Sequence, residues 1–209
     1  MDKYKTTFES WDKVASLYEE HFMDLDLYND TYDAFCEAME KSNPEILEIG
    51  CGPGNITKYM LSKRPDFDLM GIDIAPNMIE LAKKNNPKAT FQVMDSRDID
   101  QLKTKYDGII CGFCIPYLSK SDCSKLIKDM KNLLSEKGIL YLSFIEGDYE
   151  KSGYQSGSSG DQVYFYYHTL EKIQTDLSGN GFEMIDIYNK NYTRKDGTSE
   201  THTILIARK

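Results

Sequence analysis

The segment at residues 46–57, ILEIGCGPGNIT, constrains the possible folds of this chain more than any other segment. It begins with an apolar run that suits a strand buried on both faces, interrupted by one charge at Glu48. Three glycines at alternate positions then require a sharp turn, where positive φ angles and absent side chains let a ligand approach the backbone. These glycines are Gly50, Gly52 and Gly54. Helical spacing from Asn55 onward predicts a strand–turn–helix unit that presents a helix N-terminus to a ligand.

The glycine spacing separates two classes of nucleotide site. In the dinucleotide fingerprint G-x-G-x-x-G the third glycine would stand at position 55, where this chain has Asn55. The pattern E-x-G-x-G-x-G from Glu48 to Gly54 resembles the first motif of the class I S-adenosylmethionine-dependent methyltransferases. The resemblance extends from about Trp11 to the C-terminus. It implies a methyltransferase that uses S-adenosylmethionine and releases S-adenosylhomocysteine, and a dinucleotide-dependent oxidoreductase is the least favoured alternative.

The resemblance also implies which residues contact the cofactor. Asp73, about nineteen residues beyond Gly54, would accept hydrogen bonds from both ribose hydroxyls. Asp95, after the third strand, would bind the adenine amino group, and for both aspartates capping of the next helix is the alternative role. Tyr18 ends a W-x-x-x-A-x-x-Y pattern and would lie near the methionyl carboxylate. The expected cofactor contacts are Tyr18, Glu48, Gly50, Cys51, Gly52, Gly54, Asn55, Asp73, Ile74, Met78, Asp95, Ser96, Gly112, Phe113 and Tyr117.

The order of apolar segments predicts a single α/β domain over residues 1–209. We expect a Rossmann-like sheet of seven strands with helices on both faces, and the antiparallel last strand is a trait of the resembled family. Residues 44–209 would form this core, and residues 1–43 would form an N-terminal helical cap of two helices, the first with Ser10 as its N-cap. Strands are expected at 46–49, 69–74, 90–94, 106–112, 139–145, 182–192 and 201–207. Four helices are expected between them: one at 55–63, one that begins after Asn77, another that ends at Leu134, and one at 170–177.

Residues 146–162 differ from the rest in composition, being rich in Ser and Gly. Long loops in compact domains are often functional, so we predict a mobile lid over the methyl acceptor, with a solvated insertion as the alternative. The acceptor site would lie between the N-terminal helices, the 113–117 loop, this lid and the 164–168 stretch. Four tyrosines suggest an acceptor that is partly apolar, or a cation held by ring faces. They are Tyr149, Tyr154, Tyr164 and Tyr166.

Methyl transfer from a sulfonium requires mainly that donor and acceptor are held in line. A general base is needed only where the acceptor must lose a proton. His168, beside three tyrosines near the lid, is the candidate catalytic residue, and a structural histidine is the alternative reading. His21, Glu146 and Asp148 are further candidates, whereas His202 in the terminal hairpin is expected to lie away from the cofactor. No metal-ligand spacing is present, so we expect no metal.

The charge balance bears on the acceptor. Acidic residues outnumber basic ones by 34 to 25, giving a net charge of −9, which argues against a broad nucleic-acid-binding face. A small-molecule acceptor is therefore expected. A protein or tRNA acceptor and a non-catalytic S-adenosylmethionine-binding module remain open. The N-terminus has no apolar signal core and no apolar run approaches membrane-spanning length, which predicts a cytoplasmic protein that does not interact with membranes.

Overall fold

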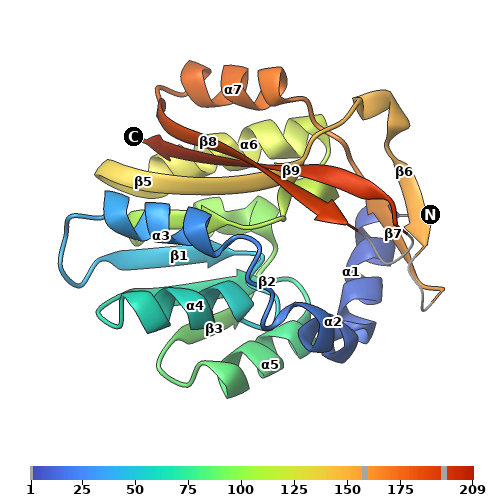
Figure 1. Ribbon diagram of the computed structural model, residues 1–209, viewed down its shortest axis with the longest axis horizontal. Helices are drawn as coiled ribbons and strands as arrows, with labels where there is room; N and C mark the ends of the chain where they lie inside the picture. Colours follow the sequence, from blue (N-terminus) through green and yellow to red (C-terminus); the bar gives the residue numbers. More distant parts are fainter. Residues whose placement is uncertain (1, 157–159, 194–196) are drawn as a thin grey trace.

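A seven-stranded sheet forms the centre of the molecule, with the strand order β3-β2-β1-β4-β5-β9-β8 (Figure 1). The computed structural model describes residues 2–156, 160–193 and 197–209. The first five strands are parallel, while β9 is antiparallel to both β5 and β8, so the Rossmann-like prediction with an antiparallel last strand is confirmed. The strands are β1 (Glu45–Ile49), β2 (Asp68–Asp73), β3 (Thr90–Val93), β4 (Tyr106–Cys111), β5 (Leu134–Ile145), β8 (Glu183–Thr193) and β9 (Ser199–Arg208).

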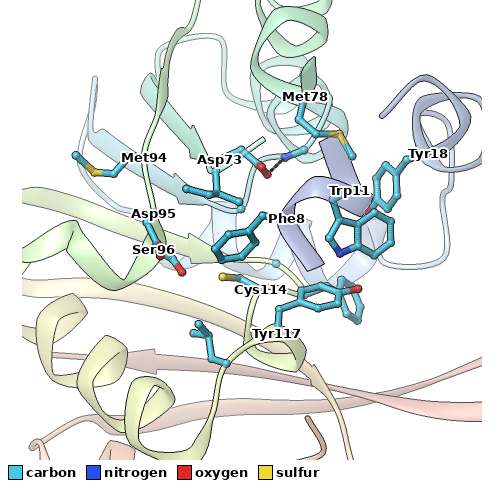
Figure 2. A pocket seen from close by; sticks show the side chains of 16 residues that line it. Phe8, Trp11, Tyr18, Asp73, Met78, Met94, Asp95, Ser96, Cys114 and Tyr117 are labelled. Carbon is cyan, nitrogen blue, oxygen red and sulfur yellow. Dashed lines mark hydrogen bonds between the residues drawn. The ribbon is translucent and has the colours of Figure 1, made fainter. Parts of the chain in front are cut away.

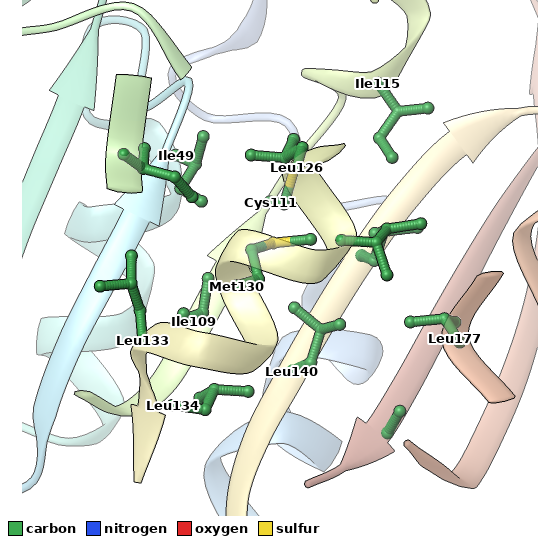
Figure 3. Packing of buried hydrophobic residues seen from close by; sticks show 14 of the residues in the cluster. Ile49, Ile109, Cys111, Ile115, Leu126, Met130, Leu133, Leu134, Leu140 and Leu177 are labelled. Atoms are coloured by element: carbon green, nitrogen blue, oxygen red, sulfur yellow. The ribbon is translucent and has the colours of Figure 1, made fainter. Parts of the chain in front are cut away.

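Helices cover both faces of this sheet. One buried cluster joins α3 and α4 to the sheet through Phe35, Met60 and Tyr141. The other joins α6 and α7 to the opposite face through residues such as Met130 and Leu177 (Figure 3). The α-helices are α1 (Lys3–Lys13), α2 (Ala15–Phe22), α3 (Asn29–Ala38), α4 (Asn55–Lys63), α5 (Pro76–Asn85), α6 (Lys120–Leu133) and α7 (Leu170–Gly179), and the short 3-10 helices are η1 (Ser96–Gln101), η2 (Ile115–Tyr117) and η3 (Tyr149–Lys151).

Strand β5 shows how the two layers share the sheet. Side chains alternate between faces along a strand, and here both faces are apolar. Leu140 and Phe144 belong to the α6–α7 cluster, whereas Ile139 and Tyr141 belong to the α3–α4 cluster. All four side chains are buried, and burial of one such side chain contributes about 1.5–3 kcal/mol. Strand β5 is therefore fixed by packing on both sides.

The N-terminal segment contains three helices rather than the predicted two. Asp2 caps α1 by accepting hydrogen bonds from the backbone N–H groups of Tyr4 and Lys5, so this helix begins well before Ser10. A turn at Val14 separates α1 from α2. Ser10, predicted as an N-cap, lies inside α1, and its hydroxyl donates a 2.6 Å hydrogen bond to the carbonyl oxygen of Gln162. The prediction was wrong because the helix has an earlier cap.

The segment predicted as a lid contains regular structure. Within 146–162 the chain forms η3 and then strand β6 (Gly153–Ser156), which pairs antiparallel with β7 (Gln162–Phe165). The β6–β7 hairpin lies beside α1 (Figure 1), where the Tyr164 N–H donates a 2.9 Å hydrogen bond to Thr7 Oγ1. Residues 157–159 of the predicted lid lie outside the described residues. Within the described ranges, no helix is both long enough and apolar enough to cross a membrane.

Candidate functional site

The glycine turn after β1 has the backbone that the sequence predicted. Gly50, Gly52 and Gly54 have φ angles of 71°, 52° and 83°, in the left-handed region that favours glycine. A Cβ atom on Gly50 would lie 3.1 Å from the Cys114 Cβ, and one on Gly54 would collide with the Asn86 side chain. The turn leads directly into α4. Its backbone borders the cavity described below, and at Gly50 and Gly54 there is no room for a side chain.

The first cavity, of about 110 Å³, lies between this turn, the ends of β2 to β4 and helix α1 (Figure 2). Its lining includes most of the predicted cofactor contacts. Asn55 lines a different cavity, and Glu48, Cys51 and Gly54 line neither. The sequence prediction missed Phe8, Trp11, Met94, Cys114 and Leu118. The first cavity is lined by Phe8, Trp11, Tyr18, Gly50, Gly52, Asp73, Ile74, Met78, Met94, Asp95, Ser96, Gly112, Phe113, Cys114, Tyr117 and Leu118.

Two of the missed residues follow a recognisable pattern. Phe8 and Trp11 are three positions apart in α1 and therefore lie on the same side of that helix. Helical spacing extended N-terminally from Trp11 would have found Phe8. Trp11 packs edge-on against Tyr18 and Tyr117, with ring centroids 5.6 and 5.5 Å apart. Aromatic side chains from α1 and α2 therefore close one side of the first cavity.

Asp73 connects the glycine turn to the end of β2. Its Oδ2 accepts a 2.9 Å hydrogen bond from the Gly52 N–H, and its Oδ1 accepts one of 2.9 Å from the Ala75 N–H. Burial raises the pKa of the Asp73 carboxyl, and the backbone donors oppose this by stabilising the charged form. The carboxylate thus supports the glycine turn and forms part of the cavity wall, whereas α5 has Ala75 as its N-cap and no side-chain cap, so Asp73 does not have the alternative capping role.

Asp95 occupies a similar position after β3. It accepts a 2.9 Å hydrogen bond from the Arg97 N–H at the start of η1, which is the predicted capping role. The Arg97 guanidinium also pairs with this carboxylate, with an Nη2–Oδ2 distance of 2.5 Å, and lies 4.0 Å from the centroid of the Tyr4 ring. Asp95 therefore enters the first cavity with its orientation fixed by Arg97.

Glu48 lies in the sheet beneath the glycine turn and is fully buried. Its Oε2 accepts a 2.5 Å hydrogen bond from Thr57 Oγ1, while Oε1 has no hydrogen-bond partner among the described residues. Burial raises the pKa of the Glu48 carboxyl to about 8. Glu48 therefore keeps its proton at neutral pH and lies behind the cavity wall. The wall itself carries Asp73, Asp95 and the apolar side chains of Ile74 and Met78, which suit a cationic nucleoside.

A second cavity, of about 550 Å³, continues from the first and shares Phe113 and Tyr117 with it. Phe113 has a φ angle of 55°, which is uncommon for a residue with a side chain, and its N–H donates a 2.9 Å hydrogen bond to Ser143 Oγ. The second cavity is lined by Trp11, Tyr18, Phe22, Leu25, Tyr28, Tyr32, Gly50, Gly52, Asn55, Ile56, Gly112, Phe113, Pro116, Tyr117, Ile145, Gln155, Ser156, Phe165, Tyr192, Glu200 and His202.

Comparison with known proteins identifies a domain and a fold. A family model described as a methyltransferase domain matches residues 46–138. The magnesium protoporphyrin IX methyltransferase of Synechocystis PCC 6803, solved with bound S-adenosylmethionine, superposes with a TM-score of 0.73. The chain contains a methyltransferase domain and has the fold of the S-adenosylmethionine-dependent methyltransferases. That superposition covers 100% of this methyltransferase and 98% of the other chain at 18% sequence identity, so it concerns the fold.

Two curated relatives of this methyltransferase differ in how much of their length is matched. A putative methyltransferase of Invertebrate iridescent virus 6 is 28% identical over 213 residues, which cover 93% of this chain and 75% of the viral protein. A malonyl-[acyl-carrier protein] O-methyltransferase of Acetivibrio thermocellus is 33% identical over 105 residues, covering 49% of this chain and 36% of that enzyme. The shared part of the second relative is therefore limited to about half of this methyltransferase.

His168, the predicted catalytic residue, lines neither cavity. It is buried, and its Nε2 lies 3.0 Å from the carbonyl oxygen of Leu118. Its own carbonyl oxygen accepts a hydrogen bond from the Gly147 N–H, and burial lowers the pKa of its imidazole. The ring of His168 is thus turned toward the loop that precedes α6 and lies outside both cavities.

His202 was expected to lie away from the cofactor, and it lies outside the first cavity but lines the second. His202 lines the second cavity and stands opposite Ile145 in the β5–β9 register. Because β9 is antiparallel to β5, the first residues of β9 lie at the edge where the parallel strands end. That edge is where ligands of open α/β sheets bind.

The four tyrosines predicted at the acceptor site lie outside both cavities. Along β7, Phe165 faces the second cavity, whereas Tyr164 faces the other way and lies 4.0 Å from Lys3 Nζ. The cavity is nevertheless aromatic, through other side chains. Among the described residues, no group of three or more His, Cys, Asp or Glu side chains could hold a metal ion.

Proposed function

We propose that this methyltransferase transfers a methyl group to a small molecule bound in the second cavity. The observation that carries this proposal is the continuity of the two cavities across Gly112, Phe113 and Tyr117. A cofactor in the first cavity and an acceptor in the second would meet at these residues. The walls of the second cavity come from segments that are far apart in the chain, as suits a ligand that is enclosed rather than bound on a surface.

The residues of the first cavity have distinct roles in this proposal. Asp73 accepts hydrogen bonds from the ribose hydroxyls, and Asp95, oriented by Arg97, accepts one from the adenine amino group. Ile74 and Met78 flank the adenine ring. Tyr18 and the glycine backbone at Gly50 and Gly52 line the part of the cavity that takes the methionyl end. When bound, S-adenosylmethionine supplies an activated methyl group on a positively charged sulfur.

The chain's own contribution to the reaction is orientation and exclusion of water. Holding two reactants in line supplies several kcal/mol of the barrier reduction. The left-handed backbone at Phe113 is a local strain of about 1–3 kcal/mol, and such strain is concentrated at functional sites. It directs the Phe113 ring against Tyr28 and His202, with ring centroids 5.1 and 4.9 Å apart. This packing fixes the wall that the two cavities share.

The lining of the second cavity favours an acceptor with an apolar or aromatic body. Aromatic rings are its commonest lining groups, and its polar lining includes Glu200 and His202 near the start of β9. This distribution is typical of small-molecule sites. The net charge of −9 counts against tRNA as the acceptor.

The test is a calorimetric titration of S-adenosylhomocysteine into the wild type, Asp73→Ala and Asp68→Ala. Asp68 is exposed at the opposite end of β2 and serves as the matched control. We expect binding by the wild type and by Asp68→Ala, and at least tenfold weaker binding by Asp73→Ala, since hydrogen bonds to charged groups contribute about 1.5–3 kcal/mol. Absence of binding to the wild type would refute the cofactor assignment.

The acceptor class is tested separately, by release of S-adenosylhomocysteine in the presence of small-molecule, tRNA and protein fractions. Turnover with small molecules alone would support the proposal. Turnover confined to tRNA or protein would replace it with a macromolecular acceptor. Cofactor binding without turnover in every fraction would favour a non-catalytic binding module.

A further inference from the structure

Three polar side chains form a continuous chain on one wall of the second cavity. Tyr28 Oη lies 2.6 Å from His202 Nδ1, and His202 Nε2 lies 2.9 Å from Glu200 Oε1. Tyr28 and His202 are buried, and all three residues line the cavity. Tyr28 comes from the segment before α3, 174 positions away from His202 in the sequence, so the arrangement is made by the tertiary fold.

The chemistry of the three groups fixes the direction of these hydrogen bonds. A carboxylate only accepts hydrogen bonds, so the proton on the neutral imidazole lies on Nε2, facing Glu200. Nδ1 is then an acceptor, and the Tyr28 hydroxyl donates to it. Burial raises the pKa of the Tyr28 phenol above its usual range, so Tyr28 is protonated before the acceptor reacts. The lone pairs of Tyr28 Oη remain able to accept a hydrogen bond from a ligand in the cavity.

The other groups around His202 do not replace this arrangement. Tyr192 of β8 stacks on the imidazole with a centroid distance of 5.2 Å, and Phe113 packs against it edge-on. Lys190 stands opposite His202 in the β8–β9 register, but its ammonium group is paired with Asp30 at 2.6 Å. Among the described residues, the carboxylate paired with the imidazole is Glu200, and its charge stabilises a positive charge on His202.

We propose that Tyr28, His202 and Glu200 form a proton relay that activates a hydroxyl-bearing methyl acceptor. This inference rests on the proposed function of the second cavity and specifies its substrate class. Tyr28 is the catalytic residue that touches the acceptor, His202 takes up the proton, and Glu200 is a positioning residue that fixes the imidazole tautomer. The same division of roles between base and orienting carboxylate occurs in other enzymes.

The proton and electron changes balance without a further reactant. The acceptor hydroxyl gives its proton to Tyr28 Oη while the Tyr28 proton passes to His202 Nδ1. The acceptor oxygen uses its electron pair to bond to the methyl carbon, and the carbon–sulfur bond breaks with both electrons remaining on sulfur. The proton on His202 returns through Tyr28 to water after the methylated product has left.

The test is nitrogen NMR of the full chain labelled at its three histidines, with His202 assigned from its loss in a His202→Asn sample. We expect His202 to carry its proton on Nε2 and Tyr28→Phe to shift its Nδ1 signal. Tyr32→Phe, at another tyrosine of the same cavity, is the control and should leave that signal unchanged. In Glu200→Gln the titration midpoint of His202 should move to lower pH by about one unit, because a neighbouring negative charge is lost.

A proton on Nδ1 in the wild type, or an unchanged His202 signal in Tyr28→Phe, would overturn the relay. So would an acceptor that the wild type and Tyr28→Phe methylate at equal rates, since loss of general-base catalysis is expected to lower the rate at least about 100-fold. S-adenosylhomocysteine titrations of the same samples separate the two proposals. Failure of the wild type to bind refutes the proposed function, whereas normal binding with an unchanged His202 signal refutes only the relay.

Discussion

Glu48 and Thr57 join β1 to α4 by a 2.5 Å hydrogen bond from Thr57 Oγ1 to Glu48 Oε2, across the glycine turn. Both side chains are completely buried. The bond holds the start of α4 against the end of β1, so the turn between them is supported from inside the protein. It also leaves one carboxyl oxygen of Glu48 available in the interior.

Glu48 predicts a pH dependence of stability. Burial raises its pKa from 4.5 to about 8 in the folded protein, so the folded state holds a proton that the unfolded chain releases. This contribution to stability is complete below about pH 4.5 and is lost as the pH rises toward 8. We expect the Tm of the wild type to fall by about 5 °C or more between pH 5 and pH 9. Glu48→Gln should show a smaller fall in scanning calorimetry, whereas Glu45→Gln, exposed on the same strand, should behave as the wild type.

The backbone conformation at Gly54 predicts that adding a single methyl group there destabilises the folded protein. An alanine there would adopt a φ of 83° and place its Cβ against Asn86 and within 3.3 Å of Ala82 Cα. We expect Gly54→Ala to lower the free energy of unfolding by about 2 kcal/mol or more. Gly153→Ala, where the Cβ meets no atom within 4 Å, is the control and should change stability by less than about 0.5 kcal/mol. Equal denaturation midpoints for the two variants would contradict this account.

Thr7 predicts local loosening of the β6–β7 hairpin. Its buried hydroxyl accepts from the Tyr164 N–H and donates to the Lys3 carbonyl oxygen. Thr7→Val leaves the Tyr164 N–H without this acceptor, at a cost of about 1–3 kcal/mol. Amide hydrogen exchange should become faster in β7 and remain slow in β5. In Thr175→Val, which removes a comparable bond within α7, exchange in β7 should not change.

Trp11 predicts an optical signal for cofactor binding. It is the single tryptophan of the chain, lines both cavities, and has a buried Nε1 without a hydrogen-bond partner among the described residues. S-adenosylhomocysteine should change its emission with the same midpoint as the calorimetric titration. Trp11→Phe should bind without a change in tryptophan emission. Calorimetric binding to the wild type with constant emission would show that the ligand lies elsewhere.

Local patterns explain how much of the site could be predicted from sequence. Strand β1, helix α4 and the glycine turn depend on neighbouring residues, and the expected range 55–63 matches α4. Asp73 and Asp95 follow from the ends of strands in the same way. The start of the first N-terminal helix was not predicted, because its Asp2 cap lies well before the aromatic pattern that begins at Trp11.

Other features depend on contacts between distant residues. The hairpin within 146–162 is held by α1, and Ser10 and Gln162 are 152 positions apart. Composition alone therefore suggested an irregular loop. The pairing of His202 with Tyr28 is equally remote in sequence. Its position at the ligand edge follows only when the antiparallel direction of β9 is combined with the edge rule for α/β sheets.

Helix α1 contributes to the walls of both cavities. It covers the first cavity with Phe8 and Trp11, and through Thr7 and Ser10 it holds the hairpin whose Phe165 encloses the second. A displacement of α1 that uncovers the first cavity therefore also releases one wall of the second. We expect the spent cofactor and the methylated product to dissociate in the same opening event, so that movement of α1 determines the release rate of both.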